Sequence, residues 1–355
     1  MKKILLLATT PFLNDGITKI EMDIIRYNKR KIDFTVASAF SFDNIYGKEL
    51  SKNKINCYRL TSKNKVIQYM VDIYRLIKKE DYNAVYIHGN SAMMFIEALP
   101  VWLARKSRII THCHNTSSNY PLMHKVFKPF FNQIISKKLA CSKSAANWAY
   151  YGENIKVIVN GIDIEKFAYD AVKREIIRKE LSWDDAFIIG HVGRFERQKN
   201  HSFLIDIFFE VQRQIPETRL LLIGSGELEN KIKKQVADYE LMDKVAFLGN
   251  VDCVSDYLQA MDILVLPSFF EGLCLVALEA QANGMPVLIS DKMSKEIFAT
   301  SCIAPLSLNA PIIEWVKHIT DCKNKNRIYS QGILREKGYD LKRMMSEIQT
   351  ILLEI

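Results

Sequence analysis

The sequence predicts an α/β protein built from two Rossmann-like domains, each with a doubly wound parallel sheet. The first observation behind this prediction is length, because 355 residues exceed one ordinary core and suit two domains. The second is that short apolar runs alternate with segments of helical period along most of the chain. The third is that these runs are almost continuously apolar, which is typical of strands buried on both faces of a sheet.

Six strands are predicted in the first half, with helices between several of them. Their runs are 3–8, 32–37, 84–88, 108–112, 139–141 and 157–159. A polar segment, 163–185, follows the last of these strands, and we interpret it as the linker between the domains, with a hinge nearby.

The second half alternates more regularly. Strands are predicted at 186–192, 218–223, 244–248, 262–266 and 286–290, and helices at 200–214, 227–241, 255–260 and 273–283. This succession predicts a parallel, doubly wound sheet. The last segment, 340–355, carries apolar residues at helical spacing, so one face of a helix is predicted to pack on another part of the chain.

Composition argues against several classes of protein. No apolar run approaches the roughly 18 residues that a membrane-spanning helix needs. The apolar residues 4–8 are too few for a signal peptide and are interpreted as a buried strand. The seven cysteines are odd in number, scattered and without a Cys-x-x-Cys pair, which argues against a disulfide framework and against a zinc site. We therefore expect a reducing, cytoplasmic location.

Charge is divided unequally along the chain. Residues 1–160 hold 25 Lys and Arg against 11 Asp and Glu, whereas residues 161–355 hold 24 against 29. The first half is therefore expected to face something anionic, which leaves nucleic acid, an anionic membrane leaflet and a phosphate-bearing substrate as alternatives.

The loop after strand 262–266 offers a ligand site. Parallel sheets bind ligands beyond the carboxyl ends of their strands, where helix N-termini present free N–H groups to phosphates. Gly272 lets the backbone approach a ligand, and Glu271 and Glu279 place two carboxylates eight positions apart. They suit two separate hydroxyl groups, such as those of a sugar and a ribose. The spacing alone fits a surface glutamate and an ordinary helical one equally well.

Two cations stand after strand 186–192. Arg194 follows the strand closely, and Lys199 comes just before the next helix. Two fixed cations near a helix N-terminus form a diphosphate clamp without a metal, although each alone is more often a solvated surface charge. Gly224 opens another tight turn after a strand, which is a weaker signal because a lone Gly-x-Gly is mostly geometry.

The first half adds three candidate residues. Gly16 opens a helix after the first strand, where its N–H suits a phosphate, although a plain turn fits as well. Strand 108–112 runs into His112 and His114, and histidines at such a position bind metal, donate hydrogen bonds or fill a core. Because no further ligands are spaced for zinc, we expect no metal. A hydrogen-bonding role at the donor sugar or its phosphate is expected for His114, and a core role for His112.

Taken together, these motifs resemble those of glycosyltransferase family 4, whose members have the GT-B fold, and in particular its bacterial capsule and exopolysaccharide transferases. The resemblance covers nearly the whole chain and depends on seven motifs in the family's order. They are the Gly16 loop and the stretches 111–115, 140–143, 159–163 with Phe167, 192–195 with 198–200, 224–227 and 267–279.

The resemblance implies two Rossmann-like domains facing a cleft. The first is 1–163, on which a C-terminal helix at 340–355 packs back, and the second is 164–339, which binds the nucleotide sugar. It also implies a retaining, metal-independent hexosyltransferase that uses a nucleotide sugar, with UDP as the expected nucleotide, and no cofactor. The transferred group would be a hexose or N-acetylhexosamine. The acceptor would be a lipid-linked glycan or an oligosaccharide in capsule, exopolysaccharide or other cell-surface glycan synthesis.

Carried over by residue, the resemblance implies a complete donor site. The side chains that it assigns contact the diphosphate (Arg194 and Lys199), the ribose (Glu279), the sugar near the anomeric centre (Glu271) and the sugar with its phosphate (His114). Backbone N–H groups come from Gly16, Gly272 and Leu273, and the Gly224 turn adjoins them. Glu271, His114, Arg194 and Lys199 form the catalytic set. The implied chemistry is a front-face displacement in which the departing phosphate helps to deprotonate the acceptor, with cations in place of a metal.

Three residues depart from the family pattern in the half that is expected to hold the acceptor. Asp15 stands where the family often has glycine, Thr18 where glutamate is common, and Asn115 where aspartate often follows the histidine. We expect Asp15 and Asn115 on the acceptor side, with the Asp15 carboxylate contacting a hydroxyl group rather than a phosphate.

The basic first half then acquires an expected partner, because transferases of this type commonly act on lipid-linked diphosphates at the inner face of the cell membrane. The segment that begins at Leu122 and ends at Lys138 has five large apolar residues beside four lysines, as a basic amphipathic helix on an anionic membrane would. A core helix with a solvated charged face fits equally well.

Two rival functions have to be weighed. A nucleotide-sugar epimerase of the same fold would need an added acid/base set and no acceptor. A non-catalytic partner subunit would bind a sugar nucleotide or an anionic polymer, but the intact set of Glu271, Glu279, Arg194 and Lys199 argues against it. Nucleic acid is not an expected partner, because no recognised motif accompanies the charge.

Overall fold

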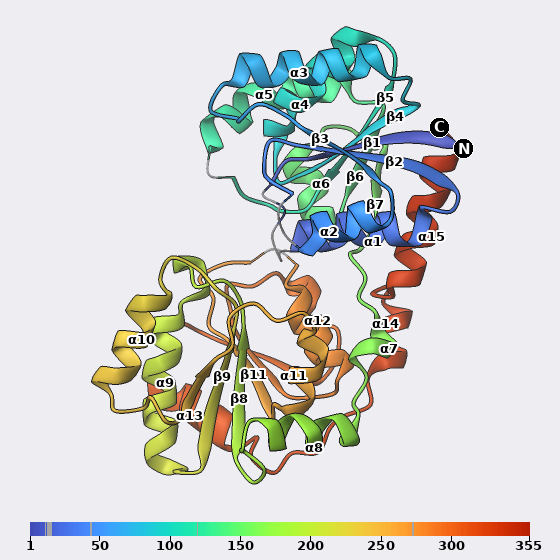
Figure 1. The fold of residues 1–355 in the computed structure, drawn as a ribbon. Coiled ribbons are helices and arrows are strands. Elements are labelled where there is room, and N and C mark those ends of the chain that lie inside the picture. Colours follow the sequence, from blue (N-terminus) through green and yellow to red (C-terminus); the bar gives the residue numbers. More distant parts are fainter. Residues whose placement is uncertain (11, 13–15, 43–44, 119, 272) are drawn as a thin grey trace. The chain divides into compact units, whose positions relative to one another are not determined.

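The computed structural model describes residues 1–10, 12, 16–42, 45–118, 120–271 and 273–355. They form two compact units (Figure 1), the first made of Met1–Gly161 and Lys342–Ile355 and the second of Ile162–Leu341. The division predicted from the sequence, 1–163 with 340–355 and 164–339, lies within two residues of these bounds.

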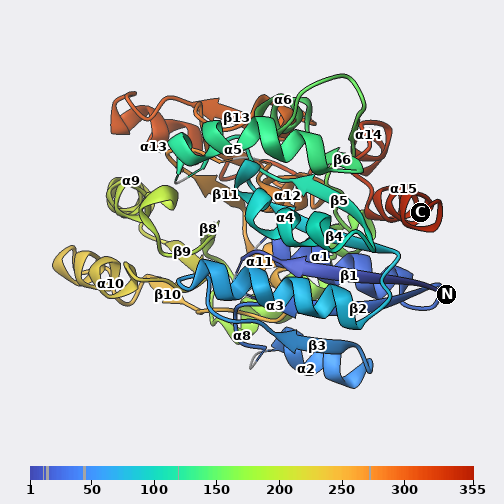
Figure 2. The ribbon, with the colours of Figure 1, turned by 90° about the horizontal axis from the view of Figure 1, so that it is seen from above.

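The first unit contains a sheet of seven parallel strands in the order β3-β2-β1-β4-β5-β6-β7, which Figure 2 shows from β3 to β6. Helices α3, α4 and α5 cover one face, and α1 and α15 the other (Figure 1). The strands are β1 (Lys2–Ala8), β2 (Ile32–Ser38), β3 (Asn56–Arg59), β4 (Ala84–Gly89), β5 (Arg108–Cys113), β6 (Lys137–Ala140) and β7 (Ile155–Val157). The helices are α1 (Gly16–Asn28), α2 (Ile45–Lys52), α3 (Val66–Lys79), η1 (Ala92–Met94), α4 (Phe95–Ala104), α5 (Pro121–Ile134), α6 (Lys143–Ala149) and α15 (Leu341–Leu353).

The second unit contains six parallel strands in the order β10-β9-β8-β11-β12-β13. Helices α9, α10 and α13 cover one face of this sheet, and α8, α11 and α12 the other (Figure 1). The strands are β8 (Phe187–Val192), β9 (Thr218–Ile223), β10 (Val245–Phe247), β11 (Ile263–Leu266), β12 (Val287–Ser290) and β13 (Ile303–Leu306). The helices are α7 (Ile164–Phe167), α8 (Ala171–Glu180), η2 (Arg197–Lys199), α9 (His201–Gln214), α10 (Glu229–Asp238), α11 (Val254–Ala260), α12 (Leu275–Ala282), η3 (Lys295–Ile297), α13 (Ile312–Thr320) and α14 (Gln331–Glu336).

The strand orders locate the ligand-binding edges. In the first sheet the order reverses between β1 and β4, and in the second between β8 and β11. At such a reversal, successive crossover helices go to opposite faces and leave a crevice beyond the carboxyl ends of the two strands. Strand β8 packs closely enough that Gly190 has no room for a side chain, since a Cβ there would lie 2.0 Å from Sδ of Met261.

The segment 163–185 was wrongly predicted to be a linker. It folds as part of the second unit and contains α7 and α8. Asp170 caps α8 by accepting from the N–H groups of Val172 and Lys173. Arg174 and Arg178, on one face of this helix, form ion pairs with Asp262 at 2.5 and 2.7 Å. The segment looks polar because its charged residues form ion pairs with residues elsewhere in the second unit, such as Asp262.

The prediction of one amphipathic helix over 122–138 is also corrected, because the helix ends earlier. Helix α5 ends at Ile134, and Lys137 and Lys138 begin strand β6. Phe131 is fully buried in the core of the first unit, and Phe127 and Ile134 pack against that core. One face of α5 is therefore a core face, as in the second of the two interpretations.

The prediction that the C-terminal helix buries one apolar face is confirmed. Met344, Met345, Ile348 and Leu352 of α15 are at most 2% exposed, and the Gln349 amide donates to Asn28 on α1 at 2.7 Å. Strands β3 and β13 lie at sheet edges and were not predicted. Within the described residues, no helix is long and apolar enough to span a bilayer.

Candidate functional site

In the second unit, the loop after β8 carries both predicted cations. The Gly193 N–H donates to the Ile223 carbonyl at 2.9 Å, which sets the loop beside β9. A Cβ on Gly193 would lie 3.0 Å from Cδ of Lys199, so the missing side chain makes room for the lysine stem. Asn200, at φ 55°, then turns the chain into α9.

Three hydrogen bonds join this loop to the loop after β11. The Phe269 N–H donates to the Gln198 carbonyl at 2.9 Å, and the Gln198 side-chain amide donates to the Phe270 carbonyl at 2.8 Å. The Asn200 amide donates to the Pro267 carbonyl at 3.1 Å. Two loops that leave neighbouring strands are thereby fixed against each other at the reversal of strand order.

Lys199 and Glu271 meet where these loops touch. The Lys199 Nζ lies 2.8 Å from Oε2 of Glu271, and the two side chains are only 17% and 9% exposed. The second carboxylate oxygen, Oε1, accepts from the Ser268 hydroxyl at 2.7 Å. The sequence placed both residues near a ligand, but it did not show that they form an ion pair with each other.

Each partner keeps the other charged. Burial works to raise the pKa of Glu271, but the Lys199 ammonium and the Ser268 hydroxyl hold it below its ordinary value. Burial likewise works to lower the pKa of Lys199, yet the Glu271 carboxylate raises it. A cation and an anion thus stand together in a place largely shielded from water, where charge interactions are strong.

Arg194 occupies a different environment. Its guanidinium forms an ion pair with Glu196 at 2.7 Å and is 47% exposed. Such an exposed pair contributes little to stability and is easily broken. The two cations predicted to act as one clamp are therefore unequal in this structure, because Lys199 is largely shielded from water and Arg194 lies at the surface.

The Gly224 turn packs against the loop after β8, next to Gly193. Gly224 has φ +135°, and a Cβ on it would lie 2.1 Å from the Gly193 carbonyl oxygen. Its N–H donates to the Gly249 carbonyl at 2.8 Å. Gly224 thus allows close packing of two backbones, while its own N–H is used within the fold.

The second predicted carboxylate lies in the following helix. Glu279 belongs to α12 and is 4% exposed, and α12 begins at Leu275 rather than at residue 273. Leu273 is half-buried just before the helix, and Gly272 lies outside the described residues.

In the first unit, Gly16 is exposed at the first position of α1, and Asp15 lies outside the described residues. Asn115 is half-buried after β5, where its Oδ1 accepts from the Thr116 N–H at 2.8 Å. The Asn115 side chain is therefore engaged within its own loop.

His114 belongs to a cluster of three buried histidines at the carboxyl ends of β4 and β5. His88 and His112 are fully buried, as predicted for His112, and His114 is 7% exposed. Nδ1 of His88 lies 2.9 Å from Nε2 of His114, and the Tyr86 hydroxyl lies 2.9 Å from Nδ1 of His112. Burial lowers the pKa of His114 to about 3 and the pKa values of the other two well below their ordinary value. All three are neutral at physiological pH.

His88 was not among the candidate residues identified from the sequence. It lies directly opposite His112 in the β4–β5 pairing. The signal was present, since His88 ends the predicted strand 84–88, and side chains at the carboxyl ends of parallel strands gather at one edge.

The nitrogens of this cluster lie within 4.8 Å of one another, close enough to suggest a metal site. The hydrogen bond between His88 and His114 argues otherwise. A shared zinc ion sits about 2.0–2.1 Å from each nitrogen, and both lone pairs have to point at it. Here two nitrogens only 2.9 Å apart point at each other.

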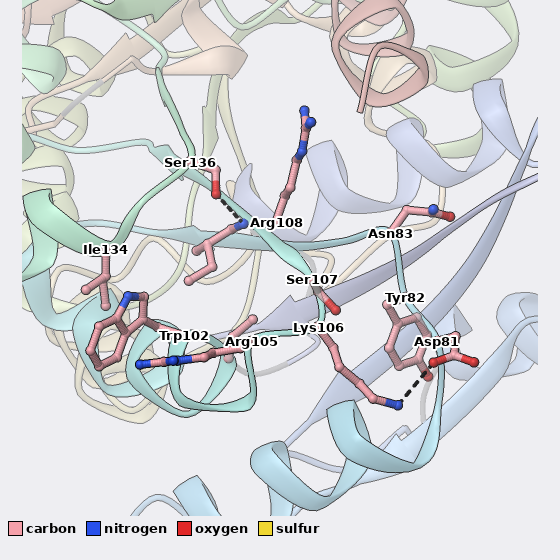
Figure 3. A pocket seen from close by; sticks show the side chains of 12 residues that line it. Asp81, Tyr82, Asn83, Trp102, Arg105, Lys106, Ser107, Arg108, Ile134 and Ser136 are labelled. Carbon is pink, nitrogen blue, oxygen red and sulfur yellow. Dashed lines mark hydrogen bonds and ion pairs between the residues drawn. The ribbon is translucent and has the colours of Figure 1, made fainter.

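A separate cavity of about 760 Å³ opens at the amino ends of β4 and β5, away from the ligand-binding edge. Three cations, Arg105, Lys106 and Arg108, are among its lining residues, but Figure 3 shows that their side chains point in different directions. Lys106 is paired with Asp81 at 3.1 Å. The cavity therefore provides no convergent set of cations for an anion.

Comparison with known proteins decides the family. Residues 26–166 match the family model described as Glycosyltransferase Family 4, and residues 172–298 match the one described as Glycosyl transferases group 1.

This chain belongs to glycosyltransferase family 4.

Relatives of this glycosyltransferase agree with the assignment. Putative glycosyltransferase EpsF of Bacillus subtilis is 29% identical over 287 residues, which cover 76% of this chain and 74% of EpsF. UDP-Gal:alpha-D-GlcNAc-diphosphoundecaprenol alpha-1,3-galactosyltransferase of Escherichia coli is 28% identical over 265 residues, 70% of this chain and 67% of that one. The crystal structure of Anabaena HepE with UDP-glucose matches over the full length of both chains, with a TM-score of 0.81 at 19% identity. The predicted family and GT-B fold are confirmed.

Proposed function

We propose that this glycosyltransferase moves a hexose or N-acetylhexosamine from a UDP-sugar to a lipid-linked or oligosaccharide acceptor in cell-surface polysaccharide synthesis, with retention of anomeric configuration. The observation that carries the proposal is the buried Lys199–Glu271 pair at the carboxyl ends of β8 and β11. The names of relatives support the substrates. HepE was crystallised with UDP-glucose, and the E. coli relative is named for UDP-galactose and a diphosphoundecaprenol acceptor.

In the proposed reaction, Lys199 binds the donor diphosphate and Glu271 accepts hydrogen bonds from the transferred sugar. The bond between the anomeric carbon and the phosphate oxygen breaks, and the acceptor oxygen bonds to that carbon on the same face. The acceptor proton passes to the departing diphosphate, whose negative charge Lys199 stabilises. Arg194 adds a second cation on leaving Glu196, and no metal takes part.

The remaining predicted residues complete the proposed site. Glu279 binds the ribose, and His114 contacts the sugar and its phosphate. The N–H groups of Gly16, Gly272 and Leu273 bind phosphate oxygens, as N–H groups at helix N-termini do. Asp15 and Asn115 remain proposed for the acceptor side.

Transfer assays test this function. The purified chain is supplied with a panel of nucleotide sugars and a diphosphoundecaprenol-linked sugar, and the anomeric configuration of the product is read by proton NMR. Lys199→Ala should reduce transfer by about 10²–10³-fold, the usual loss for a group that stabilises charge in the transition state. Arg197→Ala, an exposed cation two residues away, is the matched control and should transfer normally. The proposal would be contradicted if Lys199→Ala kept full activity or if the product had inverted configuration. Release of free epimerised nucleotide sugar without transfer would also contradict it.

Metal independence has its own test. We expect the transfer rate to stay the same after dialysis against EDTA, because the cationic side chains take the place of a metal at the diphosphate. Loss of activity that is restored by Mg²⁺ or Mn²⁺ would show that the leaving group needs a metal ion.

We also propose that α5 contacts the anionic inner face of the cell membrane. The proposed lipid-linked acceptor would lie there. Leu122, Val126 and Phe130 are 73%, 50% and 55% exposed, on the side of α5 away from the core. Lys125 is exposed on the same helix. Lys128 and Lys138 are less available, since both donate to backbone carbonyls of their own unit. Apolar contact therefore supplies more of the proposed binding than charge does.

A further inference from the structure

His191 is a fully buried histidine near the carboxyl end of β8. Its Nδ1 lies 2.8 Å from the carbonyl oxygen of Val265 in β11. The backbone pairing of these two strands joins Gly190 to Leu264, and His191 and Val265 are the next residue on each strand. The His191 side chain therefore joins β8 to β11 one residue beyond the last paired residues that the structure describes, at the reversal of strand order.

The hydrogen-bond partner decides which nitrogen of His191 carries the proton. A backbone carbonyl oxygen accepts hydrogen bonds and has no proton to donate, so Nδ1 has to be the donor. The other tautomer would set the lone pair of Nδ1 against this oxygen. It would also bury an N–H at Nε2, where no partner lies among the described residues. The contact with Val265 therefore assigns the proton to Nδ1.

The ring is also neutral and lies close to Lys199. Nε2 of His191 and the Cδ and Cε atoms of Lys199 all lie within 3.2 Å of one point, the position that a Cβ on Gly193 would occupy. Burial, together with the Lys199 ammonium, lowers the pKa of His191 to about 4. The imidazole thus occupies the space beside the lysine stem without adding a second positive charge there.

The two strands that His191 joins lead directly into the two loops of the candidate donor site. Strand β8 ends at Val192, and the loop that carries Lys199 follows it. Strand β11 ends at Leu266, and the loop that carries Glu271 follows it. Because the ion pair between Lys199 and Glu271 is 2.8 Å long, its geometry depends on how far apart these strand ends lie.

We propose that His191 is a positioning residue of the donor site, which donates from Nδ1 to the Val265 carbonyl and so fixes the separation of the strand ends that lead to Lys199 and Glu271. Its ring is fully buried, so it acts through these two side chains and not on the substrate. This inference rests on the proposed function and specifies how the charged pair of that site is held.

The tautomer is read by NMR on the intact protein, labelled with ¹⁵N in its seven histidine rings. Long-range proton–nitrogen correlations separate protonated from bare nitrogens, and the signals of His191 are identified by their loss in His191→Asn. At pH 7 we expect a protonated Nδ1 and a bare Nε2. A proton on Nε2, or on both nitrogens, would overturn the inference, whether or not the protein transfers sugar.

Unfolding measurements test whether His191 acts on the ion pair. His191→Leu removes the donor, and Glu271→Gln removes the charge that pairs with Lys199. If His191 holds the pair in place, Glu271→Gln should destabilise His191→Leu less than it destabilises the wild type, because residues that act as a unit are not additive. Additive losses in urea denaturation would mean that the two residues act independently, and they too would overturn the inference.

Matched variants separate the hydrogen bond from packing. His191→Asn keeps an N–H near the former Nδ1, whereas the longer side chain of His191→Gln places its amide near the former Nε2. In transfer assays, His191→Leu and His191→Gln should lower kcat by about tenfold, the equivalent of one hydrogen bond, with little change in the KM for the nucleotide sugar. His191→Asn should recover most of that loss. Equal kcat values in His191→Leu and His191→Asn would show that only packing matters.

His201→Phe is the control. His201 is buried and packs on His191, with ring centroids 4.5 Å apart, but neither of its ring nitrogens has a hydrogen-bond partner in the described parts of the chain. The phenylalanine keeps a ring against Phe195, so this variant should transfer at the wild-type rate and leave the His191 tautomer unchanged.

The outcomes separate this inference from the proposed function. If the wild type transfers no sugar, the proposed function fails, and the NMR and unfolding measurements still decide whether His191 holds the pair. If transfer is normal but Nδ1 of His191 carries no proton, this inference alone fails. Should His191→Leu not fold, the wild-type spectrum and the comparison of His191→Asn with His191→Gln are sufficient to decide.

Discussion

Lys199 and Glu271 depend on each other for their charged states, although 72 positions separate them in the sequence. Residue type and position after a strand were enough to propose both as site residues. Their pairing was not predictable, because it follows from the hydrogen bonds that Gln198 and Asn200 make to the neighbouring loop. His88 shows the same difficulty, since its position beside His112 and His114 follows from strand pairing and not from a local motif.

Glu271→Gln is expected to lower the free energy of unfolding by about 3 kcal/mol at pH 7, because it leaves the Lys199 cation buried without its partner. The difference should shrink at acid pH. The folded pKa of Glu271 is lowered, so the stability it contributes is complete above its ordinary value of 4.5 and is lost as pH falls through the folded value. Urea titrations at pH 7 and in steps below pH 4.5 measure this. Glu210→Gln, at an exposed pair with Arg213, is the control. A destabilisation that did not vary with pH would contradict the charge argument.

At the scale of elements, the apolar runs predicted the central strands well but missed the edge strands β3 and β13. Three of the four residues of β3 are exposed, and β13 contains Pro305, which is tolerated at a sheet edge. Neither has the continuous apolar run of a strand buried on both faces. The charged helix α8 was mistaken for a linker for a related reason, because its ion-pair partner Asp262 is remote in sequence.

Asp262 is expected to be the strongest polar contact between α8 and the second sheet. Its carboxylate accepts from Arg174, from Arg178 and from the Ile188 N–H. Asp262→Asn should lower the free energy of unfolding by about 3 kcal/mol, since two partly buried guanidinium groups lose their counter-charge. Asp256→Asn breaks the exposed pair between Lys173 and α11 and should cost at most about 1 kcal/mol. Chemical denaturation compares the two variants, and equal losses would refute the proposed importance of burial.

The outer face of α5 makes a separate prediction. Replacing Leu122, Val126 and Phe130 by Ser should abolish binding to phosphatidylglycerol vesicles in co-sedimentation, because the apolar area that enters the lipid interface is removed. Ile67→Ser on α3 removes one apolar side chain elsewhere that is 80% exposed, and it is the control. Unchanged sedimentation of the triple variant would exclude α5 as the membrane contact.

At the scale of the whole molecule, the two units are not two successive halves of the sequence. Helix α15 comes last in the chain but belongs to the first unit, where Lys31 and Asn28 bind Gln349. The apolar spacing of 340–355 predicted that this helix packs on something. The assignment to the first domain came from resemblance to the family, because periodicity identifies a buried face but not the surface that covers it.

A substitution that creates a cavity in the core of one unit should therefore destabilise that unit and increase hydrogen exchange there. Ile348→Ala in α15 is expected to cost about 2–5 kcal/mol and to increase hydrogen exchange in α1 and β1, with little change in β8 and β11. Ile319→Ala in α13 is the matched control and should produce the opposite distribution, since this equally buried residue belongs to the core of the second unit. Exchange that rises equally in both units after either substitution would mean that the units do not unfold separately.

Under the proposed function, the Lys199–Glu271 pair also makes the donor site selective. An anion that drew Lys199 away would leave behind a carboxylate that is shielded from water and lacks a cation. A nucleotide sugar would compensate for this loss, because its diphosphate would bind the lysine while its hydroxyl groups donated to the glutamate. A nucleoside diphosphate would bring only the first of these, so the carboxylate would compete with it for the lysine. After the proposed transfer, the same competition would favour departure of the nucleoside diphosphate.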